Sequence, residues 1–187
     1  MIIALLGLMS LTLIAMNSST NAVILPEQDL LQIQKSELKF ISKADLETIQ
    51  AASNKLKGKI IKSTNKFEFV LSIESFMGFN SPLQREHFLE NYMEANVFPK
   101  ATYAGTVIDP VEWDKQGVAN FRTKGKLSIH GVTKECVIKV QLINDGELRK
   151  FKSEFSVLLK DYNIAIPRLV KQKINEEIKI SVSGTLQ

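Results

Sequence analysis

The chain has 187 residues, with 24 Lys or Arg, 20 Asp or Glu and one Cys, and its net charge at neutral pH is +4. The single Cys136 cannot form an internal disulfide, which excludes a small disulfide-stabilised secreted fold. The basic residues are dispersed among acidic ones and lack neighbouring stacking aromatics, so nucleic acid is not an expected partner.

Residues 1–22 form an apolar N-terminal segment without a charged side chain. Its apolar run, residues 2–16, is shorter than the about 20 residues that a membrane-spanning helix needs. Small residues up to Ala22 fit cleavage by a signal peptidase, so we expect residues 1–22 to be a secretory signal peptide. Residues 23–187 are then one domain, periplasmic or secreted. A retained membrane anchor is the alternative, because no Lys or Arg precedes the apolar run. A lipoprotein is excluded, because it requires a Cys directly after the run and none is present there.

The segment SKADLETIQAA is predicted to be helical over residues 45–52. Ser42 is a good N-cap residue, and the Asp45 side chain in the first turn can bond back to the backbone N–H of Ser42, as in a capping box. The densest basic run follows, and it alternates with apolar and small residues. Such a run is typical either of a solvated strand face or of a patch that makes transient contact with a membrane; its members are Lys55, Lys57, Lys59, Lys62 and Lys66.

A second helix is predicted over SPLQREHFLENYMEAN, where Ser81 is the N-cap, Pro82 takes the first helical position and Pro99 closes the segment. His87 and Glu90 have a spacing that could ligate a metal, but the pattern occurs once, so we expect no metal site. Glu86 and His87 could act as acid and base. No nucleophile motif or phosphate-binding loop accompanies them, so we expect no enzyme and no catalytic residue.

Period-2 alternation of apolar and polar residues dominates the rest of the chain and predicts at least six strands. Each strand has one apolar face, and the turns between strands are short; Asp145 and Gly146, for example, favour a tight hairpin. Short turns indicate an antiparallel sheet. A long sheet with one apolar face must fold over or close, so we predict a mainly β, extended antiparallel barrel with one or two short helices at its side or mouth.

Four segments in this order are similar to one known family: SPLQREHFLENYME, VFPKATYAG, KGKLSIHGVTKE and FSVLLKDYNIAIP. The third is the most diagnostic, with Gly125, Leu127 and Ile129 leading into the turn His130, Gly131, Val132 and Thr133. The chain resembles, over residues 28–186, the YceI-like family of secreted lipid- and polyisoprenoid-binding proteins. The resemblance implies a lipocalin-like barrel. Tyr103 stands where Phe is expected, and the helix at residues 45–52 stands where a longer strand pair is expected.

Strand parity defines the residues that we expect to face the barrel interior, and the resemblance implies that they bind the ligand. They are Phe67, Phe69, Leu71, Ile73, Tyr103, Phe121, Leu127, Ile129, Ile138, Phe155, Val157 and Leu159. Residues that we expect to gate the mouth lie in the loop before the second helix and on that helix: Phe76, Met77, Phe79, Phe88 and Tyr92. Arg85 or His87 is a candidate for contact with a ligand head group.

The resemblance implies a non-catalytic carrier that holds a long-chain isoprenoid or other amphiphilic lipid in the barrel within the cell envelope. The expected ligand is a polyisoprenoid, an isoprenoid quinone or a fatty amphiphile, with no other cofactor, and the protein is a monomer or a homodimer. The alternative is a barrel filled by its own side chains, which acts through its surface as an interaction or membrane-docking module. Alternation alone does not separate a hollow barrel from a filled one.

Overall fold

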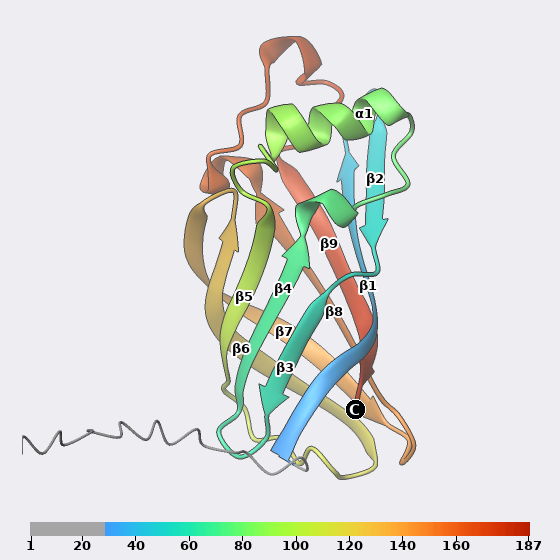
Figure 1. Ribbon diagram of the computed structural model, residues 1–187, viewed down its shortest axis with the longest axis vertical. Coiled ribbons are helices and arrows are strands. Elements are labelled where there is room, and N and C mark those ends of the chain that lie inside the picture. The colour runs from blue at the N-terminus through green and yellow to red at the C-terminus, as the bar shows by residue number, and fades with distance from the viewer. Residues whose placement is uncertain (1–28) are drawn as a thin grey trace, which may run out of the picture.

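The structure is a computed structural model that describes residues 29–187, so the expected signal peptide lies outside the described residues. It consists of nine strands and one short α-helix, α1 (Pro82–His87), as Figure 1 shows. The strands are β1 (Leu30–Lys43), β2 (Thr48–Ser53), β3 (Lys57–Ile61), β4 (Lys66–Ser72), β5 (Lys100–Val107), β6 (Gly117–Ile129), β7 (Val132–Asn144), β8 (Arg149–Leu158) and β9 (Glu177–Leu186).

The sheet closes into an antiparallel barrel because β1 pairs with β9 on one side and with both β2 and β3 on the other. β2 and β3 pair with β1 in one continuous register. Leu38 faces Ser53, and six residues earlier on β1, Gln32 faces Lys59, which lies six residues after Ser53. They are therefore two halves of one strand, interrupted at residues 54–56. The barrel is eight-stranded in effect, and the predicted fold class, a mainly β lipocalin-like barrel, is confirmed.

The predicted helix over residues 45–52 is wrong, because β2 occupies most of this range. Ser42 is a buried residue of β1, one position before its end, and its hydroxyl accepts a hydrogen bond from the backbone N–H of Asn175 at 2.9 Å instead of capping a helix. Ala51 pairs with Phe40 across the β1–β2 hairpin and is 2% exposed. Pairing and burial outweigh a weak local helix preference here. The strand pair expected from the family resemblance is present.

The second helix begins as predicted, with Ser81 accepting a hydrogen bond from the N–H of Gln84 and Pro82 in the first turn. α1 ends at His87 and continues as a π-helical turn, Phe88–Tyr92. The N–H of Met93 bonds to the carbonyl of Phe88 at 2.9 Å, the five-residue spacing of a π-helix. Figure 1 shows α1 lying across one end of the barrel, which we call the α1 end.

The opposite end, which we call the Trp113 end, is closed by the loop between β5 and β6. Trp113 is 6% exposed and packs edge-to-face on Phe121, with ring centroids 5.6 Å apart. Its indole N–H donates to Asn65 Oδ1 at 3.0 Å, and Arg149 Nε donates to its carbonyl at 3.1 Å. A side chain of the β3–β4 turn and the first residue of β8 thus hold this loop against the core.

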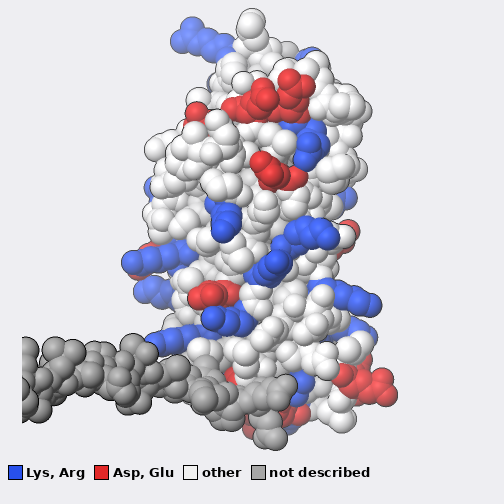
Figure 2. Space-filling view, viewed as in Figure 1, with Lys and Arg blue, Asp and Glu red and all other residues white. Residues whose placement is uncertain are grey.

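The basic run lies on the outer wall, in and around β3 and at the start of β4. Lys59 forms an ion pair with Glu68 at 3.4 Å, and Lys62 with Asp114 at 2.9 Å. Figure 2 shows basic and acidic side chains interspersed over the barrel wall in this view. These pairings favour the solvated strand face over a membrane-facing patch for this run.

Candidate functional site

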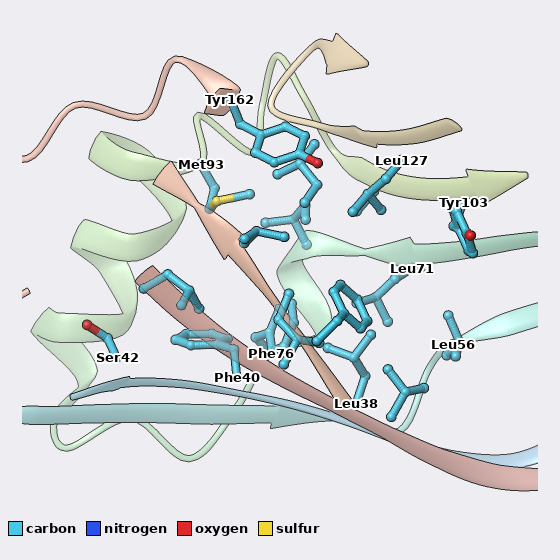
Figure 3. A pocket seen from close by; sticks show the side chains of 18 of the residues that line it. Leu38, Phe40, Ser42, Leu56, Leu71, Phe76, Met93, Tyr103, Leu127 and Tyr162 are labelled. Carbon is cyan, nitrogen blue, oxygen red and sulfur yellow. The ribbon is translucent and has the colours of Figure 1, made fainter. Parts of the chain in front are cut away.

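The barrel interior holds a cavity of about 540 Å³ between the Trp113 end and α1. Side chains from all nine strands line it, together with residues of α1 and of the segment around Tyr162. Figure 3 shows these side chains converging on one space, with leucine, phenylalanine and methionine prominent among them. The barrel is therefore hollow rather than filled by its own side chains.

All twelve residues expected to face the interior lie on the cavity wall. Phe67, Leu71 and Phe121 are at most 5% exposed, and Ile73 is 2% exposed. Strand parity placed ten of them because β4 to β8 keep a regular pleat over their paired lengths. The other two, Ile73 and Leu159, begin the 3₁₀ turns that follow β4 and β8. Their contact with a ligand stays a prediction.

Sequence analysis missed the part of the wall that β1 and β2 provide. It includes Leu38, Phe40, Ser42, Ile49 and Leu56, the last in the break between β2 and β3. β1 has a register shift between Ile33 and Lys35, so its inward residues change from odd to even numbers. A search for two short alternating runs joined by one extra residue would have found this strand.

Four of the five expected mouth residues line the cavity, and three of them form an aromatic cluster with Phe40. The Phe40 ring lies 5.2 Å from Phe76, 5.9 Å from Phe79 and 5.3 Å from Phe88, centroid to centroid. Tyr92, the fourth, also lies on the wall. The aromatic cluster joins β1, the loop before α1 and the π-helical turn.

Met77, the fifth expected mouth residue, does not line the cavity, and its role at the mouth stays a prediction. Its backbone pairs with Ala52 of β2 through two hydrogen bonds of 2.8 and 2.9 Å. In extended backbone, neighbouring side chains point to opposite sides. Because Phe76 points inward, Met77 points outward and is 60% exposed.

Arg85 fastens the mouth loop to α1. Its Nε donates to the carbonyl of Phe76 at 3.0 Å, and its Nη2 donates to the carbonyl of Glu74 at 2.7 Å. Arg85 is outside the set of lining residues, whereas His87 belongs to it. Of the two candidates for head-group contact, the structure thus places only His87 on the wall.

Two polar side chains in the middle of the wall, Tyr103 and Thr123, form hydrogen bonds within the protein. Thr123 Oγ1 donates to the carbonyl of Ile138 at 3.0 Å, and the Tyr103 hydroxyl lies 3.0 Å from the same Oγ1 and donates to it. Burial raises the pKa of Tyr103 to about 12, so its hydroxyl stays neutral. With its hydrogen-bonding groups paired, this part of the wall presents mainly apolar surface.

Most of the remaining polar groups of the wall gather at the α1 end. They come from the β1–β2 hairpin, from α1 and from residue 173. Glu47 is held by the side-chain amides of Gln84, at 2.8 Å, and Asn80, at 3.2 Å. His87 and Lys173 lie on the same part of the wall. The cavity is therefore apolar along its length and polar at one end.

The metal and acid–base alternatives concern residues of α1 and the π-helical turn. Glu86, His87 and Glu90 are all exposed. Across residues 29–187, no three His, Cys, Asp or Glu side chains come close enough together to hold a metal ion.

Within residues 29–187, no helix has the length and apolar character needed to cross a bilayer.

Comparison with known proteins gives one family. The model of the YceI-like domain matches residues 31–186. A comparison with the curated proteins found no match.

Two solved structures have a similar fold. BcnA of Burkholderia cenocepacia has a TM-score of 0.66 and 16% identity, over 81% of this chain and 96% of that one. A polyisoprenoid-binding domain from Saccharophagus degradans, described as implicated in plant cell wall breakdown, has a TM-score of 0.70 and 13% identity, over 84% and 97%. At these identities the likeness establishes the fold.

Proposed function

This chain belongs to the YceI-like family, and from that premise we propose that it is a non-catalytic carrier of a long-chain isoprenoid or similar amphiphile in the cell envelope. Support comes from the similar fold of a domain described as polyisoprenoid-binding. The apolar N-terminal segment supports a periplasmic or secreted location. The ligand is the only non-protein group that this function requires.

The observation that carries the proposal is the hollow apolar interior. The cavity volume of about 540 Å³ lies within the range of about 300–1,000 Å³ that is typical of small-molecule binding sites. Water needs polar partners, and the central polar groups, Tyr103 and Thr123, already bond to each other and to a backbone carbonyl. An apolar chain gains about 0.8 kcal/mol for each buried methylene and needs no polar partner.

The distribution of polar groups supports one orientation of the ligand. The chain would extend toward the Trp113 end, where the wall is apolar. The head group would lie at the α1 end, near His87 and Lys173. A polar head group buried away from such partners would lose hydrogen bonds to water without replacement.

The direct test is solvent extraction of the protein purified from its native envelope, followed by mass spectrometry of the extract. We expect one long-chain species in near-equal molar amount to the protein. A folded protein that yields no such species, and that takes up no added isoprenoid quinone or fatty acid, would contradict the carrier function.

A cavity-filling variant tests whether the ligand occupies this space. Val157→Trp places an indole on the wall from β8, and ligand content should fall several-fold while the fold persists. Val137→Trp is the matched control, because Val137 is 53% exposed on the outer face of β7. Equal ligand content in the two variants, both folded by circular dichroism, would place the ligand elsewhere.

A further inference from the structure

The segment between β8 and β9 carries an unusually exposed leucine at the α1 end. Leu169 is 97% exposed, more than any other large hydrophobic residue among those described. Leu46, in the β1–β2 turn, is 66% exposed, and its N–H bonds to the carbonyl of Gln172 at 3.0 Å. The two leucines therefore belong to adjacent segments. In Figure 1 the loop of residues 167–174, which we call the tip loop, is the outermost part of this end.

The tip loop is basic as well as apolar. Between Asp161 and Glu176 the chain carries Arg168, Lys171 and Lys173 and no acidic residue. Figure 2 shows blue and white atoms at the outermost point in this view, while the red atoms lie below it, over α1. Charge at this end is thus divided between the basic tip loop and two exposed acidic residues, Glu86 of α1 and Glu90 of the π-helical turn.

The β1–β2 turn beside the tip loop adds one basic and two acidic residues, Lys43, Asp45 and Glu47. Glu47 accepts hydrogen bonds from Gln84 and Asn80, so its carboxylate is held toward α1. The tip loop itself therefore keeps its positive charge without an acidic residue of its own.

The tip loop is held by hydrogen bonds rather than hanging free. A 3₁₀ turn over Arg168–Val170 presents Leu169 outward, and the N–H of Ile174 bonds to the carbonyl of Val170 at 3.2 Å. The Asn175 side chain donates to the carbonyl of Lys43 at 2.7 Å. Val170, Lys173 and Ile174 line the cavity. One short loop is therefore both the rim of the cavity and the most exposed apolar point.

We propose that the tip loop docks the α1 end on the anionic surface of a phospholipid bilayer, with Leu169 inserted among the lipids and Arg168, Lys171 and Lys173 beside their head groups. An apolar side chain next to basic residues is the pattern by which peripheral proteins bind such surfaces. Docking in this orientation brings the cavity rim to the membrane. An amphiphile then passes between bilayer and barrel with little exposure to water.

Tryptophan fluorescence tests the insertion, since Trp113 is the single tryptophan of the chain and is buried. In Leu169→Trp the added tryptophan should shift its emission to the blue when vesicles of phosphatidylcholine and phosphatidylglycerol are added. The matched control, Val137→Trp on the barrel wall, should show no shift. This readout reports on the tip loop whatever the N-terminal segment does. An unshifted Leu169→Trp spectrum with bound vesicles would overturn the proposal.

Vesicle flotation tests the charge. Replacing Arg168, Lys171 and Lys173 by Glu should lower affinity for the anionic vesicles about 100-fold or more, because each basic residue near such a surface contributes about fivefold. The control replaces three exposed wall lysines by Glu: Lys124, Lys139 and Lys152. Equal losses in the two triple variants, or equal binding of wild-type protein to vesicles of phosphatidylcholine alone, would overturn docking through the tip loop.

The proposal adds to the carrier function but is tested without a ligand, so the two can fail separately. If the tip loop docks and solvent extraction finds no lipid, the carrier function fails and docking stands. If lipid is extracted and both triple variants bind vesicles as wild type does, docking through the tip loop fails and the carrier function stands.

Discussion

The two ends of the barrel differ in how deeply their closing residues are buried. At the Trp113 end, directional hydrogen bonds join the connections: Trp113 to Asn65, Arg149 to the Trp113 carbonyl, and Lys62 and Arg149 to Asp114. At the α1 end, Gln84 bonds to Glu47 and Arg85 bonds to the mouth loop, but the side chains there are less deeply buried. Phe40 and Phe88 are only partly buried, and α1 itself has no buried residue.

This difference suggests which end admits a ligand. Opening the Trp113 end would expose the buried Trp113 side chain and break its hydrogen bond to Asn65, so it has a high cost. Contacts between aromatic rings tolerate shifts of their geometry, because they are neither strongly directional nor individually strong. We therefore expect the α1 end to open for exchange and the Trp113 end to stay closed.

The largest effect is expected for Trp113→Ala. Removing a buried tryptophan from the core leaves a cavity and should lower the free energy of unfolding by about 3–5 kcal/mol. Urea denaturation followed by circular dichroism measures this loss. Trp113→Phe, which keeps the ring but not the N–H donor to Asn65, should lose less. A loss below about 1 kcal/mol in Trp113→Ala would contradict the tight closure of this end.

Phe88→Ala at the α1 end should cost less stability, about 2 kcal/mol, because Phe88 is only partly buried. If this end is the entrance, the variant should also release a bound pyrene-labelled fatty acid several-fold faster, measured by transfer to acceptor vesicles. Release as slow as from wild-type protein, despite the loss of stability, would move the entrance away from the aromatic cluster.

Tyr103→Phe tests the wall between the two ends. Loss of the hydrogen bond to Thr123 should cost about 1 kcal/mol at neutral pH. The pKa of Tyr103 is raised from 10.0 to about 12. The stabilisation that its neutral hydroxyl gives the folded state is therefore complete below pH 10.0 and is lost as the pH rises through about 12. Between these values Tyr103→Phe should therefore lose less stability than wild type, in urea titrations at stepped alkaline pH. Equal losses of stability in Tyr103→Phe and wild type over this pH range would contradict the burial of this hydroxyl.

The smallest effect is expected for Asp114→Asn at the Trp113 end. Asp114 pairs with Lys62 and Arg149, but its side chain is 65% exposed, so the loss should stay below about 1 kcal/mol. The hydrogen bond from Lys62, with further contributions from Arg149, holds the pKa of Asp114 below its ordinary value. The stabilisation that ionised Asp114 gives the folded state is present at pH values above its ordinary pKa and is lost as the pH falls through its lowered pKa. The variant should therefore lose less stability on acidification, and a loss above about 2 kcal/mol at neutral pH would contradict a weak surface pair.

Much of the barrel could be predicted from the sequence because β4 to β9 repeat their alternation over many residues. Phe67, Phe121 and Phe155 follow directly from parity, and Ser81 and Pro82 mark the start of α1. The outward direction of Met77 could not be predicted, because composition alone does not show which way a loop residue points.

The sequence by itself determined the closed antiparallel barrel and most of its inward face, because alternation of apolar and polar residues is a local signal with a strict period. Only the tertiary structure decided that residues 48–53 form a strand, since their partners lie in β1 and in the loop before α1. The cavity likewise depends on how side chains from all nine strands fill the space between them, which no local pattern specifies. The tip loop became visible only when folding left Leu169 exposed beside three basic residues, while most of the other described leucines are at least partly buried.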